Sequence, residues 1–589
     1  MRCLSRVMFW SLLLALFIVL SVPVHAPAAS KRPVVGKKGM VVAVEPLATK
    51  IGAEILKKGG NAVDAAVAVG FALAVTHPSA GNIGGGGFMI IRMANGDAVA
   101  IDYREKAPIK ATATMYLDEN GEYARNPNIT TVSRRTGEES HPFNYRNHHL
   151  AIGVPGTVAG MTLALEKYGT MSIEEVIQPA IDLAEKGHIL TEQYARGLNG
   201  RATIFSQIPA SKKAMLRADG QPWEEGDRRV QKDLAETFKR IAKNGHDGFY
   251  NGKTAELIEK DMMANGGMMT REDLTGYRAI IREPIRGTYR GEYGIISMPP
   301  PSSGGITLTM MLNILEEYDL KKLGHNSSRT IHLMAEAMRR AYADRAQYLG
   351  DIDFVEIPID RLTSKEHAAR HLMTIDPYHA TRSEELGPEL NLSPESNETT
   401  HYSVADQYGN AVSNTYTLEG GYGSHIVITG AGFLTNNEMS DFNKKPGVTL
   451  SNGQIGTKAN LIAPEKRMLS SMTPTIVTKG GEVYLVVGSP GGRTIINTTL
   501  QLILNVVDHG MTIQQAVDAP RLHHQWFPDR LNIEGHGTPV DVIDALTIMG
   551  HKVSARGGQG DGHSIMVDPE TGYRLGGPDS RSNGAAYGH

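Results

Sequence analysis

Two threonines in the last third of the chain are spaced so that their hydroxyls could act together. The sequence from Thr399 to Thr417 alternates as two β-strands joined by a three-residue turn that ends at Gly409. If Gly409 takes the left-handed conformation, Thr399 falls opposite Thr417 at the open end of the hairpin. The same register places Asp406 opposite Asn410 beside the turn. A paired hydroxyl is a candidate nucleophile, although β-branched residues also favour strands for packing reasons alone.

A glycine pair is the second candidate element. Gly491 and Gly492 follow the apolar segment 482–487 and precede a predicted helix that begins near Thr494. Backbone N–H groups at such a turn could stabilise a developing oxyanion. The same pattern also fits a nucleotide-binding glycine loop or a plain turn.

Composition favours a large globular enzyme that acts on small molecules or peptides. The chain has 589 residues, of which 41% are hydrophobic and 21% are charged, a balance typical of folded rather than disordered proteins. Sixty basic side chains stand against 63 acidic ones. No net positive field is therefore available to attract nucleic acid or anionic lipid.

The N-terminal segment, residues 1–28, has the pattern of a secretory signal peptide. Two arginines precede an apolar run over residues 7–22, and small residues follow around Ala26 and Ala28. An uncleaved membrane anchor is the alternative, but the run is shorter than the roughly 20 residues of a spanning helix. The only cysteine, Cys3, lies in this segment, so the mature chain would have no thiol or disulfide. We expect a periplasmic or secreted protein.

The rest of the sequence divides into a mainly helical part and a part rich in short strands. Helical spacing is found at residues 47–59, 61–75, 158–168, 172–186 and 330–348. The polar stretch 118–149 indicates a surface loop, and the Pro-Pro-Pro-Ser-Ser-Gly-Gly segment 299–305 a rigid break. From Thr399 onward, strand-like alternation is found at residues 401–405, 411–417, 424–429, 473–479 and 482–487.

Several short motifs occur together in one order along the chain. After Thr399 they are residues 399–403, 417–419, 436–441, 470–472 and 488–492, and before it residues 61–66, 84–87, 104–105, 155–160 and 299–305. Together they resemble the γ-glutamyltransferase family over nearly the whole chain after the signal peptide. The resemblance implies an α+β fold, the N-terminal nucleophile hydrolase αββα sandwich, with two stacked β-sheets flanked by helices.

The family is also made as one precursor that cuts itself. Cleavage of the Glu398–Thr399 bond would divide the chain into a signal peptide (1–28), a large, mainly helical subunit (29–398) and a small catalytic subunit (399–589). The Thr399 hydroxyl would attack the carbonyl carbon of Glu398 and leave an ester that water hydrolyses. The freed α-amine has a reference pKa of roughly 7.7 to 8.0 and could serve as the base for its own hydroxyl. The two fragments would stay together as a heterodimer, and no cofactor is implied.

The resemblance also assigns roles around the nucleophile. Thr417 Oγ would orient it, and the backbone of Gly491 and Gly492 would form the oxyanion hole. A γ-glutamyl group carries an α-carboxylate and an α-ammonium beside the amide to be broken. The carboxylate would be held by Arg104, Ser470 and Ser471, and the ammonium by Glu419, Glu438 and Asp441.

The expected reaction transfers a γ-glutamyl group from glutathione or a related amide to Thr399, and then to water, an amino acid or a short peptide. Two alternatives stay open. A relative that removes glutaryl or other side chains from β-lactams, or cuts poly-γ-glutamate, would need no partner for an ammonium. A non-catalytic binding or assembly protein would need no nucleophile. No nucleic-acid partner and no stable membrane span after signal removal are expected.

Other histidines and one loop complete the predictions. His367 and His371 are four apart on a predicted helix, as metal ligands can be, but no acidic third ligand is evident in the sequence. We interpret them as a solvated helix face, and His523 and His524 as structural packing, so we expect no metal site. Residues 446–464 have the length of a lid loop, although its middle is polar where an aromatic residue is expected.

Overall fold

The computed structural model describes residues 31–124, 131–132, 139–140, 146–387, 399–448 and 458–589. Every element named below belongs to one unit, Pro33–His589. The predicted signal peptide, Glu398 and the polar middle of the predicted lid lie outside the described residues. Across the described ranges, no helix is both long and apolar enough to cross a membrane.

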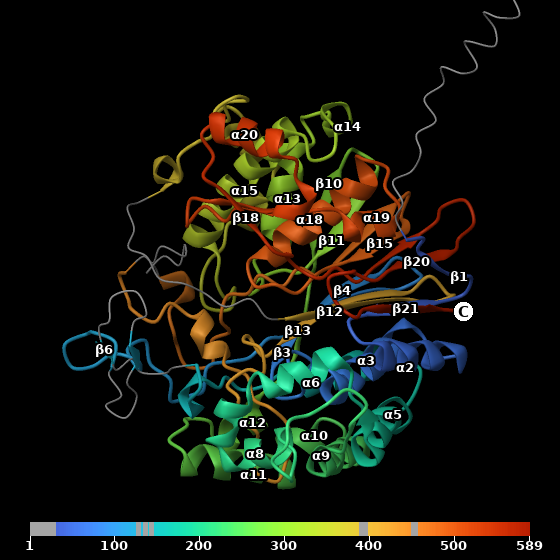
Figure 1. Ribbon diagram of the computed structural model, residues 1–589, viewed down its shortest axis with the longest axis vertical. Coiled ribbons are helices and arrows are strands. Elements are labelled where there is room, and N and C mark those ends of the chain that lie inside the picture. The colour runs from blue at the N-terminus through green and yellow to red at the C-terminus, as the bar shows by residue number, and fades with distance from the viewer. Residues whose placement is uncertain (1–30, 125–130, 133–138, 141–145, 388–398, 449–457) are drawn as a thin grey trace, which may run out of the picture. The chain divides into compact units, whose positions relative to one another are not determined.

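Two seven-stranded antiparallel sheets lie face to face at the centre (Figure 1). We call the first the hairpin sheet; in spatial order it contains β21 (Ala585–Gly588), β2 (Met40–Ala43), β12 (Thr400–Ala405), β13 (Ala411–Thr417), β3 (Gly86–Arg92), β4 (Ala98–Tyr103) and β9 (Ile280–Arg282). We call the second the glycine-turn sheet; it contains β1 (Val34–Gly36), β20 (Arg574–Gly577), β19 (Ser564–Val567), β15 (Glu482–Val487), β14 (Thr475–Lys479), β11 (Tyr293–Ser297) and β10 (Ile285–Tyr289).

Apolar side chains fill the space between the sheets. Phe88 and Ile90 of the hairpin sheet belong to the same buried cluster as Ile476, Val486 and Ile565 of the glycine-turn sheet. Because successive side chains of a strand point to opposite faces, the other face of each sheet must be covered separately. Helices supply that cover on both sides (Figure 1).

The helices form one layer on each side of the paired sheets (Figure 1). On the hairpin sheet's side lie α2 (Pro46–Lys57), α3 (Ala62–Thr76), α4 (Thr157–Tyr168), α5 (Ile173–Lys186), α6 (Glu192–Asn199), α7 (Ala202–Ser206), α8 (Pro209–Met215), α9 (Lys232–Asn244), α10 (Asp247–Tyr250), α11 (Gly252–Ala264) and α12 (Arg271–Gly276). On the other side lie α13 (Gly304–Leu315), α14 (Leu320–Leu323), α15 (Ser328–Tyr348), α16 (Ile359–Leu362), α17 (Lys365–Leu372), α18 (Thr494–Val507), α19 (Ile513–Asp518) and α20 (Val540–Ile548).

Three small sheets lie outside these layers. They are β16 (Leu522–His523) with β17 (Leu531–Glu534) and β18 (Val553–Arg556), β5 (Thr131–Val132) with β6 (Glu139–Ser140), and β7 (His188–Ile189) with β8 (Arg228–Arg229). The four main layers match the αββα sandwich that the resemblance implied.

The strong local signals in the sequence are confirmed. The predicted helices correspond to α2, α3, α4, α5 and α15. At the start of α3, Asn61 Oδ1 accepts from the N–H groups of Val63 and Asp64, while Asp64 accepts from the Asn61 N–H. This reciprocal capping box satisfies N–H groups that a helix start otherwise leaves without partners.

The predicted strand at residues 424–429 is wrong. This segment makes only an isolated bridge between Val427 and Leu434. His425, within the segment, has a positive φ of 62°, as does Tyr422 just before it (66°), and no regular strand accommodates such an angle. The N–H of Val427 bonds to Ser211 Oγ at 3.0 Å instead of to a neighbouring strand. Strands before Thr399, such as β3 and β4, were not predicted.

The carboxylate of Asp406 fixes the β12–β13 hairpin at its turn. Its Oδ1 accepts from the N–H groups of Tyr408 (2.8 Å) and Asn410 (3.0 Å). Its Oδ2 accepts from Asn410 Nδ2 at 2.7 Å and from the Ala62 N–H, in the first turn of α3, at 2.9 Å. The turn is therefore tied both to itself and to the positive end of a buried helix.

Replacing Asp406 by alanine removes four acceptor contacts and leaves buried N–H groups without partners. We expect Asp406→Ala to lose about 3 kcal/mol of unfolding free energy, measured as a lower urea midpoint and melting temperature. Asp568→Ala is the matched control, because Asp568 accepts from two N–H groups in the β19–β20 turn, and no helix N–H to it is recorded among the described residues. An equal loss in both variants would contradict a special role for the α3 contact.

Candidate active site

The hairpin register brings the two predicted threonines opposite each other. Thr400 pairs with Tyr416 and Ala405 with Ala411, so the same register places Thr399 opposite Thr417, as predicted. Gly409 has a φ of 97°, which is the left-handed conformation on which that prediction depended. On its other side, Thr417 pairs with Gly86 of β3.

The two faces of the hairpin have different partners. On one face the hydroxyls of Tyr402 and Tyr416 donate to carbonyl groups of α3 at 2.9 and 3.0 Å. On the other face the hydroxyl of Ser403 donates to the Val486 carbonyl of β15 at 3.2 Å. Thr399 directly precedes β12. If the alternation of side chains along the strand continues to it, Thr399 shares the face of Ser403, which is the side of the glycine-turn sheet.

The end of β15 approaches the same face of the hairpin. A Cβ added to Gly488 would lie 2.3 Å from Cε1 of His401, so the imidazole packs directly on the glycine backbone. The chain then turns through Gly491 and Gly492, whose φ angles are 127° and 57°, and α18 begins at Thr494 as predicted. A turn without side chains and a helix start therefore follow directly on the glycine that packs on His401, two residues after Thr399.

Arg104 is at the centre of a buried cluster of charges. Its side chain is 1% exposed. Nη1 lies 2.8 Å from Glu438 Oε2 and 3.4 Å from Glu105 Oε2. Nη2 lies 2.7 Å from Asp441 Oδ2, and the Asp441 side chain is 24% exposed. The predicted carboxylate-binding residue is therefore paired with carboxylates of the protein, and Asp441 is the most open of these partners.

Carboxyl groups outnumber cations in this cluster. Burial raises the pKa of Glu438 well above its usual value, although Arg104 acts in the opposite direction. The neighbouring carboxylates of Glu105, Asp441 and Glu419 raise it further. Burial likewise raises the pKa of Glu105 to about 7. The crowding thus favours the protonated form of the buried carboxyl groups, and a further cation would favour their ionised form.

The serine pair is positioned by residues that the sequence analysis did not identify. Ser471 Oγ accepts from Arg345 Nη2 at 2.8 Å, and Arg345 Nε donates to Ser303 Oγ at 2.8 Å. Ser303 Oγ in turn donates to the Ser470 carbonyl at 2.6 Å. The predicted rigid break at 299–305 is thus the support of the serine loop. Arg345 is one of three arginines in the predicted helix 330–348, and its position there does not reveal its partner.

Asn436 is a second residue whose role the sequence did not reveal. Its side-chain oxygen accepts from the N–H groups of Gly153 and Glu438, and its amide donates to the carbonyls of Gly84 and Gly153. Asn436 therefore joins the glycine segment 84–87 to the turn that carries Glu438.

Comparison with known proteins agrees with this geometry. Residues 48–589 match the family model described as Gamma-glutamyltranspeptidase. The chain is also 48% identical over 550 residues to the glutathione hydrolase proenzyme of Escherichia coli (strain K12), an alignment that covers 93% of this chain and 91% of that protein. The chain belongs to the γ-glutamyltranspeptidase family.

Solved structures extend the family assignment to the fold. The cephalosporin acylase from Bacillus halodurans superimposes with a TM-score of 0.81 at 27% identity, covering 97% of this chain and 99% of that one. The γ-glutamyltranspeptidase of Helicobacter pylori superimposes with a TM-score of 0.55 at 47% identity, covering 62% of this chain and 97% of that one. Both likenesses confirm the fold of this chain, with its two stacked β-sheets.

The histidine predictions have mixed outcomes. His523 and His524 are buried and hydrogen-bonded to Asn497, Gln525 and Asp529, which confirms a packing role. The interpretation of His367 and His371 as a solvated helix face is wrong, because His367 is only 8% exposed. The acidic partner that the sequence did not show is Asp344, on α15.

The contact between Gly488 and His401 sets the spacing between the hairpin and the glycine turn. Gly488→Ala forces a methyl group into the imidazole, so we expect a loss of about 1–3 kcal/mol of stability and a lower melting temperature. Gly557→Ala is the control, since a Cβ at Gly557 meets nothing within 4 Å. Similar melting temperatures for the two variants would show that the close contact does not constrain the site.

Proposed function

We propose that the protein is an exported precursor that cuts itself before Thr399 and then acts as a γ-glutamyltransferase and glutathione hydrolase. The observation that carries this proposal is the register that sets Thr399 opposite Thr417, in a chain of this family. Thr417 also pairs with Gly86, and Glu105 of the Arg104 cluster packs on Gly86. Two relatives' names support the reaction class: the Escherichia coli relative is a glutathione hydrolase, and the Helicobacter pylori structure is a γ-glutamyltranspeptidase.

Self-cleavage is supported by the relatives rather than by the described residues, since Glu398 lies outside them. The Escherichia coli relative is named a proenzyme. The Helicobacter pylori chain corresponds over 97% of its length to 62% of this chain, which is close to the share of the proposed large subunit, residues 29–398. The proposed products are therefore that subunit and a catalytic subunit, residues 399–589, held as a heterodimer after loss of the signal peptide 1–28.

The proposed cycle begins when the Thr399 α-amine accepts the proton of its own hydroxyl. The oxygen attacks the amide carbonyl carbon of the donor, and backbone N–H groups at Gly491 and Gly492 stabilise the oxyanion. The amide nitrogen leaves with a proton, and the γ-glutamyl group remains as an ester on Thr399. Water or an amine then attacks the ester. Thr417 Oγ keeps the nucleophile oriented.

The buried charges support recognition of both α-groups of a γ-glutamyl donor. The excess of carboxylates suits the α-ammonium, for which Glu419, Glu438 and Asp441 are the proposed partners. The α-carboxylate would share the guanidinium of Arg104 and the hydroxyls of Ser470 and Ser471. Asp441 is partly exposed, so a substrate would reach this cluster from the side on which Asp441 lies.

An acylase acting on β-lactam side chains is the second candidate, because the Bacillus halodurans structure is named a cephalosporin acylase. A glutaryl group has no ammonium, and the three carboxyl groups around the one guanidinium of Arg104 would offer it no compensating charge. The same excess of carboxylates makes the γ-glutamyl donor the better fit.

The first test concerns the nucleophile. We expect Thr399→Ala to remain a single chain without amidase activity, because no hydroxyl can attack the preceding carbonyl. Thr399→Ser is the matched control, which keeps the hydroxyl and should still be cleaved. Denaturing gels and N-terminal sequencing of the smaller band check both variants. A cleaved and active Thr399→Ala protein would remove Thr399 from the mechanism.

The second test concerns the ammonium. Asp441→Asn removes one negative charge, and a charge-assisted hydrogen bond is worth about 1.5–3 kcal/mol, so kcat/KM for γ-glutamyl anilide should fall about 10- to 100-fold. Glutaryl anilide, which lacks the ammonium, is the internal control and should lose much less. An equal fall for both substrates would show that Asp441 does not bind the ammonium.

A further inference from the structure

Two histidines of α17 and one carboxylate of α15 come together outside the proposed active site. Nε2 of His367 lies 2.7 Å from Asp344 Oδ2, and Nε2 of His371 lies 2.9 Å from the same oxygen. The three ligand-capable atoms all lie within 4.8 Å of one another. We propose that Asp344, His367 and His371 form a binding site for a divalent transition-metal ion, with Zn²⁺ as the best fit.

The donor set matches the coordination chemistry of zinc. Residues four apart on a helix lie on one face, and two such histidines can present imidazole nitrogens to one ion. Two nitrogens and a carboxylate oxygen fill three positions of a tetrahedral site, and water takes the fourth. With metal–ligand distances of about 2.0–2.2 Å, tetrahedral ligand atoms lie about 3.3 Å apart. Each histidine nitrogen would therefore move away from Asp344 Oδ2 by roughly half an ångström, which small side-chain rotations allow.

The local charges also favour a cation. Asp344 Oδ2 is contacted by both imidazoles, so the carboxylate lies between the two histidines. A carboxylate supplies negative charge to a divalent ion, and imidazole is a common nitrogen ligand of zinc. A divalent ion would find one anionic and two neutral ligands, as in many zinc sites.

Partial exposure gives an ion a path to this site. The side chains of Asp344, His367 and His371 are 13%, 10% and 19% exposed. They are therefore enclosed enough to hold a fixed geometry, and His371 is the most exposed of the three.

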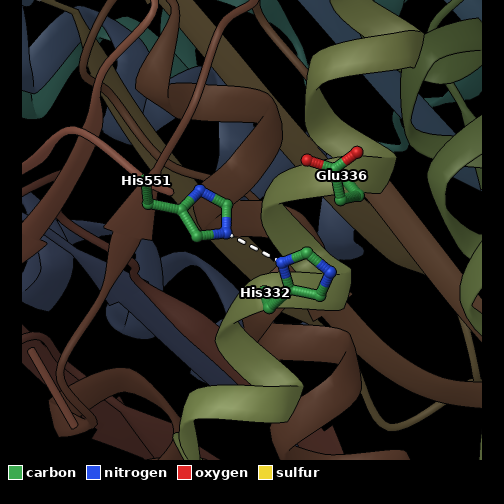
Figure 2. Close-up of side chains that lie close together, drawn as sticks. All are labelled: His332, Glu336 and His551. Atoms are coloured by element: carbon green, nitrogen blue, oxygen red, sulfur yellow. Dashed lines mark hydrogen bonds between the residues drawn. The ribbon is translucent and has the colours of Figure 1, made fainter. Parts of the chain in front are cut away.

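A second group of the same residue types lacks these properties. Figure 2 shows His332 and Glu336 on α15 with His551 beside them, and His332 Nδ1 lies 2.9 Å from His551 Nε2. Glu336, however, forms ion pairs with the guanidiniums of Arg339 and Arg340. These two positive charges occupy its oxygens and would repel a divalent ion. This group is explained as a buried hydrogen-bonded cluster, and it serves as a comparison for the first.

Occupancy of the proposed site would affect a helix that also supports the serine loop. Asp344 immediately precedes Arg345, which donates to Ser303 and Ser471. An ion shared by Asp344 and the two histidines would link α15 to α17 at that point. The proposal does not depend on the activity assigned to Thr399, since its direct readout is metal binding.

The test uses the mature protein without a histidine tag, freed of metal by chelation and dialysed against Zn²⁺ alone. We expect one zinc ion per chain by elemental analysis. Loss of an outer-shell partner costs about 10–100-fold in metal affinity, so loss of a ligand in Asp344→Asn or His371→Ala should cost at least as much. His379→Ala is the control, because its imidazole is 77% exposed on the surface. Visible absorption of bound Co²⁺ reports the geometry independently.

Three outcomes would overturn the proposal. Zinc that stays bound in both Asp344→Asn and His371→Ala places the ion elsewhere. Loss of zinc only in His551→Gln assigns it to the cluster of Figure 2. Failure of the unaltered protein to bind zinc at about 100 μM excludes a site of useful affinity. If Asp344→Asn does not fold, His371→Ala still decides, because its side chain is partly exposed.

Discussion

The register of the β12–β13 hairpin is the constraint on which the rest of the site depends. A slip by one residue would turn every side chain to the opposite face, so that Thr399 would point toward α3. Contacts on three sides prevent this. Asp406 fixes the turn, Tyr402 and Tyr416 bond to α3, and His401 packs on Gly488. The position of one hydroxyl is thus determined by the packing of both sheets and of a helical layer.

The charged cluster around Arg104 contributes little to the stability of the fold. Burying Arg104 among carboxylates gives little stability, because the desolvation of charges offsets their attraction. The cluster nevertheless has an extensive backbone framework: Asn436 holds the turn that carries Glu438, and glycines let strands approach closely. A Cβ at Gly86 would lie 2.8 Å from Glu105 Oε2. Such an arrangement fits the proposed recognition of a charged ligand better than a contribution to folding stability.

Features that depend on residues close together in the sequence could be predicted, whereas contacts between distant residues could not. The helix start at residue 61 and the left-handed conformation at Gly409 require only neighbouring residues, and both expectations agree with the structure. The pairing of Arg345 with Ser471 joins residues 126 positions apart, and no spacing rule encodes that contact. The same limit explains the error at His367 and His371. Their helical spacing was visible, but Asp344 comes from another helix, 23 residues before His367. The strand at 424–429 failed because His425 adopts a positive φ, which hydropathy does not indicate.

The sheet topology explains how a chain could be cut at its reactive residue without losing the site. Both sheets contain strands from before and after Thr399: β12 lies between β2 and β13, and β14 lies between β11 and β15. Two fragments cut there would remain interleaved, because separating them would break backbone hydrogen bonds in both sheets at once. Thr399 also directly precedes an interior strand rather than an edge strand. A new terminus at this position would be held by ladders on both sides of β12, so its α-amine would keep a defined place beside the hydroxyl that it is proposed to activate.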